Sequence, residues 1–146
     1  MSVNKNINCL KTYDINGEIN WDMLSSNPNA IHLLEAYPEK IVWNCLCENP
    51  NAIHLIEANM DKIDWEDWEE LSSNPNAIHI LEANFEHIDW MGLSINPKAI
   101  HILEANPDQI EWNYLCFNPN AVHLLEKRLS EITDVTWICW QGLSEN

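Results

Sequence analysis

The sequence predicts an all-α fold, an α-solenoid of stacked short helical hairpins with a repeat of 22 residues. The dipeptide Asn-Pro occurs five times, with spacings of 22, 25, 22 and 22 residues. Each copy continues with the same pattern of apolar residues around a histidine and a glutamate. A fixed period in this range is typical of a stacked array, because one unit alone cannot bury its apolar face. The dipeptides begin at Asn27, Asn49, Asn74, Asn96 and Asn118.

The longer helix of each hairpin is expected to begin at this dipeptide. In the first copy, Asn27 is a preferred N-cap residue, and Pro28 stands at the first helical position, where its N–H would be unpaired anyway. The apolar residues of 30–34 then cover a wide arc, which suits a helix between two neighbours. Three later copies place asparagine at the end of this helix, where the left-handed conformation is expected: Asn59, Asn84 and Asn106.

A shorter helix, which begins with tryptophan, is expected to complete each unit. Asn20, Asp64 and Asp89 precede such a tryptophan and are competent N-caps, whereas Val42 and Glu111 are poor ones. Two copies insert three residues and repeat the tryptophan, as Trp65-Glu66-Asp67-Trp68 and Trp137-Ile138-Cys139-Trp140. Three residues are nearly one helical turn, so we expect both tryptophans on one face and a bend or a wider groove there.

The repeat pattern divides the chain into three parts. Residues 21–126 are expected to form the five-repeat array. Residues 1–20 lack the Asn-Pro motif and are expected to form an N-terminal cap. Residues 127–146, where the pattern is lost at Lys127-Arg128-Leu129, are expected to form a C-terminal cap repeat.

The composition is strongly acidic, with 23 acidic and 7 basic residues and a net charge of −16. This charge argues against nucleic acid or an anionic membrane as a direct partner. The 46% apolar content and the eight tryptophans exclude a disordered acidic tail. Two interpretations of the acidity remain: a solvated surface, or a surface for a basic partner, including a mimic of nucleic acid.

The five cysteines are an odd number and form no Cys-x-x-Cys pair. Cys47 and Cys116 occupy a repeat position that holds serine in other copies, which indicates a requirement for a small side chain. Reduced thiols are therefore expected, in an intracellular protein of the cytoplasm or nucleus. The first residues do not resemble a signal peptide, and no segment has transmembrane length.

One histidine recurs in every copy, followed three residues later by glutamate. Neighbouring repeats stack at roughly 10 Å, too far apart for their side chains to converge on one metal ion, so no metal is expected. The histidines are expected either to hydrogen-bond backbone at the junctions between repeats or to form a polar binding stripe. This polar ladder consists of His32, His54, His79, His101 and His123.

No catalytic constellation can be assembled from the sequence. Gly17, Gly92 and Gly142 are the glycines of the chain, so there is no phosphate-binding loop. The acidic run from Asp61 to Glu70 lacks the turn glycine and the spacing of an EF-hand loop. We therefore expect neither an enzyme nor a cofactor.

Recognition is expected at positions that vary between copies, because the constant positions build the stack. Two variable positions follow each tryptophan and are expected to face outward. Methionine and tyrosine beside acidic residues are typical of an interface, although neutral drift explains the variation equally well. The candidate protein-binding residues are Asp22, Met23, Asn44, Cys45, Glu69, Glu70, Met91, Asn113 and Tyr114, with Gly92 at the position beside Met91.

The motif Leu-Ser-x-Asn-Pro-x-Ala-Ile-His-(Leu/Ile)-(Leu/Ile)-Glu-Ala-Asn, followed by Ile-Asp-Trp, resembles the tandem Asn-Pro-Asn-Ala-Ile repeat proteins of giant and other large DNA viruses. The resemblance covers roughly residues 19–144. It implies a virus-encoded repeat protein that acts on host or viral proteins, in a family without an assigned biochemical activity. The leading hypothesis is therefore a non-catalytic adaptor that binds another protein. The alternatives are an acidic nucleic-acid mimic that inhibits a basic protein, and a self-assembling structural protein.

Overall fold

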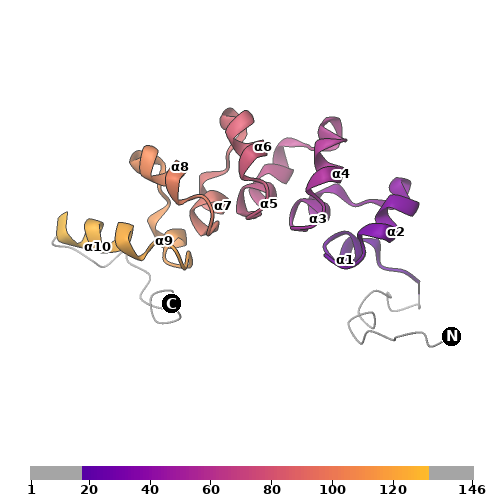
Figure 1. Ribbon diagram of the computed structural model, residues 1–146, viewed down its shortest axis with the longest axis horizontal. Helices are drawn as coiled ribbons and strands as arrows, with labels where there is room; N and C mark the ends of the chain where they lie inside the picture. The colour runs from indigo at the N-terminus through magenta and orange to yellow at the C-terminus, as the bar shows by residue number, and fades with distance from the viewer. Residues whose placement is uncertain (1–17, 132–146) are drawn as a thin grey trace.

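The computed structural model describes residues 18–131 of the 146-residue chain. All the helices and helical turns in this part are short, and they stack into an arched array of two layers (Figure 1). The tryptophan helices form the inner layer: α1 (Trp21–Ser25), α3 (Trp43–Cys47), α5 (Trp68–Ser73), α7 (Trp90–Ile95) and α9 (Trp112–Leu115). The histidine helices form the outer layer: α2 (Ile31–Ala36), α4 (Ile53–Glu57), α6 (Ile78–Ala83), α8 (Ile100–Ala105) and α10 (Val122–Glu131). The predicted all-α solenoid is thus confirmed.

Each of the first four units also contains a third piece, a 3₁₀ turn that the sequence pattern did not predict. It follows the histidine helix and leads to the next tryptophan helix. These turns are η2 (Pro38–Lys40), η3 (Met60–Lys62), η5 (Phe85–His87) and η6 (Pro107–Gln109). We number the repeats 1 to 5 from the tryptophan helices α1, α3, α5, α7 and α9. The predicted cap boundary between residues 126 and 127 falls inside α10, and the rest of both predicted caps, residues 1–17 and 132–146, lies outside the described residues.

The core is a double row of aliphatic side chains, one from each tryptophan helix and one from each histidine helix. The first row is Leu24, Leu46, Leu71, Leu93 and Leu115, and the second is Leu34, Ile56, Leu81, Leu103 and Leu125. Each of these side chains is at most 4% exposed. Burying one leucine or isoleucine contributes about 1.5–3 kcal/mol, so the regular spacing of these residues stabilises every junction alike.

The Asn-Pro dipeptide does not begin the histidine helix, and this prediction was wrong. In the first copy the helix α2 starts at Ile31, with Ala30 at the N-cap position and no side-chain cap. The Oδ1 atom of Asn27 instead accepts a hydrogen bond from the N–H of Asn29 at 3.0 Å. Asparagine favours such local turns over the helix because its side chain bonds the backbone two residues later.

The asparagine of the Asn-Pro dipeptide joins each repeat, from the second onward, to the repeat before it. Its Nδ2 atom donates to two backbone carbonyl oxygens of the preceding repeat, at 2.7–3.2 Å. We call these four residues the asparagine ladder: Asn49, Asn74, Asn96 and Asn118, each at most 2% exposed. Because a buried carbonyl without a partner is costly, the ladder explains why asparagine occupies this position.

The asparagines at the ends of the histidine helices also act through their side chains. Asn59, Asn84 and Asn106 have φ angles of −139°, −132° and −132°, so the predicted left-handed conformation is wrong. Their Nδ2 atoms donate to the carbonyl oxygen four residues earlier, at 2.8 Å in each case. This bond satisfies one of the free carbonyls at the helix end while the backbone continues into the 3₁₀ turn.

The caps of the tryptophan helices follow the prediction more closely. The side chain of Asn20 accepts from the N–H of Met23 at 3.0 Å, and that of Asp89 accepts from the N–H of Gly92 at 2.6 Å. Val42 and Glu111 provide no side-chain cap. Within residues 18–131, none of the helices has the length and apolar composition that crossing a membrane requires.

Candidate protein-binding surface

The polar ladder of histidines lies on the outside of the junctions between repeats. The Nε2 atom of each histidine from the second repeat onward is hydrogen-bonded to a glutamate Oε1 atom of the preceding repeat. The pairs are His54–Glu35 at 3.2 Å, His79–Glu57 at 2.7 Å, His101–Glu82 at 2.9 Å and His123–Glu104 at 2.9 Å. These side chains are about half exposed, and such pairs contribute little stability each.

The predicted position at the junctions is therefore right, whereas a backbone partner, the first of the two expectations for the ladder, is wrong for these four histidines. The glutamate three residues along the same helix is also not the partner. The second expectation, a polar binding stripe, stays a prediction. His32, in the first repeat, is exposed and has no such glutamate pair among residues 18–131. In the same range, no three His, Cys, Asp or Glu side chains lie close enough together to hold a metal ion.

Most of the variable positions after the tryptophans face outward, as predicted. Met23 is 41% exposed, and Met91 and Tyr114 are each 36% exposed. Asp22, Asn44, Glu69 and Asn113 are exposed, while Cys45 and Glu70 are half-buried. Gly92 differs: it is buried, and a Cβ atom there would lie 2.5 Å from the carbonyl oxygen of Glu69.

Four of the predicted residues come together around one hollow of the inner layer. Glu69 and Glu70 of repeat 3, Met91 of repeat 4 and Tyr114 of repeat 5 line a cavity of about 400 Å³. We call this cavity the methionine groove. Its wall is completed by Glu48 of repeat 2, so four successive repeats contribute to it. The other predicted residues, Asp22, Met23, Asn44, Cys45 and Asn113, do not line it.

The acidic side chains of this groove interact with each other electrostatically. Burial raises the pKa of the Glu70 carboxyl, and the negative charges of Glu69, Glu48 and Asp67 raise it further, against a backbone hydrogen bond that lowers it. The groove is therefore a surface that an approaching positive charge would stabilise.

The cysteines near the groove are not suited to nucleophilic chemistry. Burial, followed by the charges of neighbouring carboxylates, raises the pKa of the Cys47 thiol to about 12. The same causes raise the pKa of the Cys45 thiol. Because the thiolate is the reactive form, both thiols remain protonated and unreactive at neutral pH.

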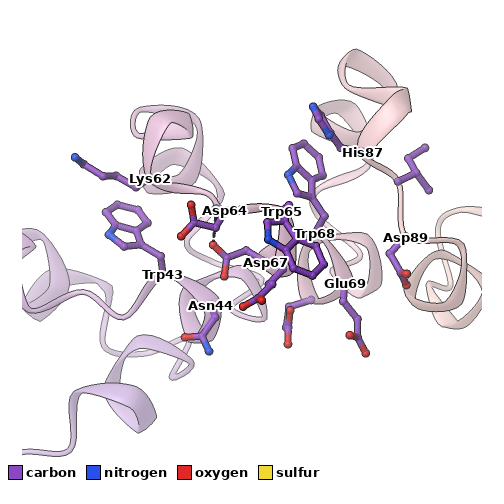
Figure 2. Close-up of a pocket in the computed structure, with 13 residues that line it drawn as sticks. Trp43, Asn44, Lys62, Asp64, Trp65, Asp67, Trp68, Glu69, His87 and Asp89 are labelled. Atoms are coloured by element: carbon purple, nitrogen blue, oxygen red, sulfur yellow. Dashed lines mark hydrogen bonds between the residues drawn. The ribbon is translucent and has the colours of Figure 1, made fainter.

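A second and larger hollow lies where the three-residue insertion enters the array. The inserted residues form the 3₁₀ turn η4 (Trp65–Asp67) directly ahead of α5, so the expected extra turn is present, and a hollow lies beside it. The cavity measures about 810 Å³. In Figure 2, Trp43 lies on one side of it, Trp65 and Trp68 on the other, and the carboxylates of Asp64 and Asp67 between them. We call it the tryptophan hollow.

The two tryptophans of the insertion do not share one buried face, contrary to the prediction. Trp68 is 7% exposed and occupies the regular repeat position, whereas Trp65 is 81% exposed. Neither α3 nor α7 has an equivalent extra turn that would cover Trp65. Three of the candidate residues, Asn44, Glu69 and Glu70, line this hollow. Trp65 was not among the candidates, although the doubled tryptophan was the signal that marked it.

Comparison of the chain with protein-family models, with curated proteins and with solved structures found no match. The function can therefore be inferred only from the surface itself, and the resemblance to viral repeat proteins stays a prediction.

Proposed function

We propose that this protein is a non-catalytic adaptor or modulator that binds another protein through its inner layer. The observation that supports this proposal is the methionine groove, where three repeats bring residues of the variable positions to one place and a fourth repeat adds Glu48. Methionine and tyrosine are enriched at protein interfaces, where a polar rim commonly surrounds an apolar centre. Met91 and Tyr114 supply the centre here, and Glu48, Glu69 and Glu70 supply the rim.

The construction of the array supports the same proposal. The asparagine ladder and the histidine–glutamate pairs fix each repeat against the previous one. A fixed arrangement keeps the groove in shape before a partner arrives, which lowers the entropic cost of binding. A specific interface buries about 800 Å² on each partner, so the partner would extend along the arch beyond the groove.

The acidity of the groove favours a basic partner, and this leaves the nucleic-acid mimic as a second candidate. In that case the target would be a nucleic-acid-binding protein, and the interaction would weaken steeply with salt, because exposed charges are screened over about 8–10 Å. We place the adaptor first because the groove combines its carboxylates with methionine and tyrosine. The proposed setting is the interior of a host cell, in line with the resemblance to viral repeat proteins.

The test is affinity capture from the native cell lysate at about 0.15 M and about 0.5 M salt, with the bound proteins identified by mass spectrometry. We expect a partner that the wild-type protein retains at high salt and that the double variant Met91→Glu with Tyr114→Ala loses. The control is the double variant Val122→Glu with Phe85→Ala. It makes the same two kinds of change at residues that are 37% and 46% exposed and do not line the methionine groove.

The result would contradict the proposal if the groove variant retained its partner as well as the control does. Capture at low salt only, with competition by DNA or RNA, would replace the adaptor by the mimic.

A further inference from the structure

Trp65 is the most exposed tryptophan of residues 18–131. Four of the other five contact an aromatic ring or a cation, and the fifth, Trp43, is partly buried and packs against the hydrophobic core. The distances between ring centroids are 5.8 Å for Trp21–Tyr37, 4.9 Å for Trp68–His87 and 5.6 Å for Trp90–Phe85. The Cζ atom of Arg128 lies 5.1 Å from the ring centroid of Trp112. Trp65 forms no such pair with any residue in this range and is 81% exposed. An exposed indole of this size beside a cavity is typical of a binding surface.

The exposed charges that line the tryptophan hollow are mostly negative. Asp64, Glu66 and Glu69 line it and are exposed, and no lysine, arginine or histidine of residues 18–131 forms an ion pair with any of them. Asp67 is engaged by the backbone, since its Oδ2 atom accepts from the N–H of Asp64 at 2.8 Å. Lys62 also lines the hollow, but its Nζ atom lies 3.4 Å from Asp61.

The last described repeat shows which chemistry suits a tryptophan of this array. There the guanidinium of Arg128 lies over the ring of Trp112 at 5.1 Å. A guanidinium is attracted to the face of an indole, and its planar shape also pairs well with carboxylates. In the tryptophan hollow, both of these partners are available at once.

We infer that the tryptophan hollow binds an arginine side chain of a basic segment in the protein partner, with Trp65 against the guanidinium and Asp64, Glu66 and Glu69 as its counter-charges. The inference rests on the proposed function for the existence of such a partner. The volume of about 810 Å³ exceeds one guanidinium, so residues that flank the arginine occupy the hollow as well. Glu69 and Glu70 line both cavities, which makes the tryptophan hollow and the methionine groove parts of one continuous surface.

The probe that tests this inference is a short Gly-Ser peptide that carries two arginines. Its counterparts carry citrulline, which has the same shape without the charge, or lysine. Binding is followed by calorimetry and by the indole Nε1–H signals of the ¹⁵N-labelled protein. We expect the arginine peptide to shift the Trp65 signal and Trp65→Ala to weaken its binding about tenfold, as cation–π contacts of this kind would. Phe117→Ala, which removes an aromatic ring that is 49% exposed and not part of either cavity, should leave binding unchanged.

Equal binding of the arginine and citrulline peptides, or equal binding by wild type and Trp65→Ala, would overturn the inference. Tighter binding of the lysine peptide would overturn the assignment to a guanidinium. The peptide assay also separates the two proposals. Loss of partner capture in the methionine-groove variant without any effect of Trp65→Ala leaves the proposed function in place and removes the arginine site. Peptide binding that depends on Trp65, together with partner capture that the groove variant leaves unaffected, would keep the arginine site and remove the methionine groove from the proposed function.

Discussion

The junction between α5 and α7 and the junction between α3 and α5 hold the same kinds of helix together by different hydrogen bonds. At the first, the Oγ atom of Ser72 accepts from the N–H of Asp89 at 3.0 Å. At the second, Cys47 takes the place of the serine, and the corresponding N–H of Asp64 donates to the inserted Asp67 at 2.8 Å. The inserted turn thus supplies the acceptor that the cysteine lacks, and it also carries Trp65 to the surface.

The asparagine ladder crosses both junctions unchanged. Asn74 donates to the carbonyls of Cys47 and Asn49 at 2.7 and 3.2 Å, and Asn96 donates to those of Ser72 and Asn74 at 2.9 Å each. This array thus accommodates extra residues at the start of the tryptophan helix α5, with the ladder behind it preserved. New surface is therefore created while the hydrogen bonds of the ladder between the repeats are kept.

The largest effect is expected from the ladder itself. Asn96→Ala would remove the amide donor to the buried carbonyl of Ser72, and an unpaired buried group costs about 1–3 kcal/mol. The carbonyl of Asn74 would lose one of two donors and keep the N–H of Ala77 at 3.1 Å, which costs about 1 kcal/mol more. We expect a loss of roughly 2–4 kcal/mol in the free energy of unfolding, measured by urea denaturation. The control is Asn27→Ala, at the same motif position in the first repeat, where the recorded side-chain bond is the turn bond to Asn29. A similar loss in both variants would contradict the role of the ladder.

The next effect concerns the close approach of α7 to α5. Gly92→Ala would bring a Cβ atom to 2.5 Å from the carbonyl oxygen of Glu69 and 3.2 Å from the backbone nitrogen of Ser73. Overpacking of this kind costs about 1–3 kcal/mol, whereas glycine to alanine in an open helix gains about 0.5–1 kcal/mol. We expect a lower melting temperature for Gly92→Ala and little change for Cys45→Ala at the equivalent position of α3. A stabilised Gly92→Ala variant would show that the helices are not packed so closely.

The two junctions use different acceptors for the corresponding N–H group, Ser72 at one and Asp67 at the other, and this replacement can be tested directly. Ser72→Ala should destabilise the protein by about 1 kcal/mol, because it removes the acceptor of a partly buried N–H. Asp67→Ala should do the same at the other junction. Adding Cys47→Ser to Asp67→Ala should restore part of the loss, since serine then offers the hydroxyl that the first junction uses. Strictly additive effects in this double-mutant cycle would argue against the exchange.

The smallest effect is a dependence on pH at Glu70, which borders both cavities. Its pKa is raised by burial and by neighbouring negative charges, so the folded state prefers the protonated form. The stability that this preference contributes is fully present below the ordinary value of 4.5 and is lost as the pH rises through the folded pKa. Glu70→Gln should therefore raise the melting temperature slightly at neutral pH and leave it unchanged near pH 4. A lower melting temperature at neutral pH would contradict this assignment.

The sequence predicted the architecture because the buried residues carry it. The leucines and isoleucines recur with the period of the array, and hydrophobic periodicity is the signal that sequence reasoning uses best. The roles of the asparagines were not predictable in the same way. A residue such as Asn96 looks like a helix cap when its neighbours in sequence are considered, but its amide donates to carbonyls 22 and 24 residues earlier.

In the candidate site, too, some features could be predicted from the repeat pattern and others depend on contacts between repeats. The outward position of Met91 and Tyr114 followed from repeat variation, but their convergence with Glu69 depends on how three repeats are placed in space. The exposure of Trp65 could not be predicted, because helical spacing gave both tryptophans of the insertion one face. It is the absence of a matching turn in the neighbouring helices that uncovers Trp65.

The central claim, that the inner layer binds another protein, is tested most directly by site-specific photo-crosslinking in the native cell. A photoreactive phenylalanine would replace Tyr114 in the methionine groove or, as the control, Val122 at the start of α10 in the outer layer. The account predicts a discrete crosslinked protein at position 114 and none at position 122. Crosslinking at position 122 alone, or an absence of crosslinks at both positions, would contradict it.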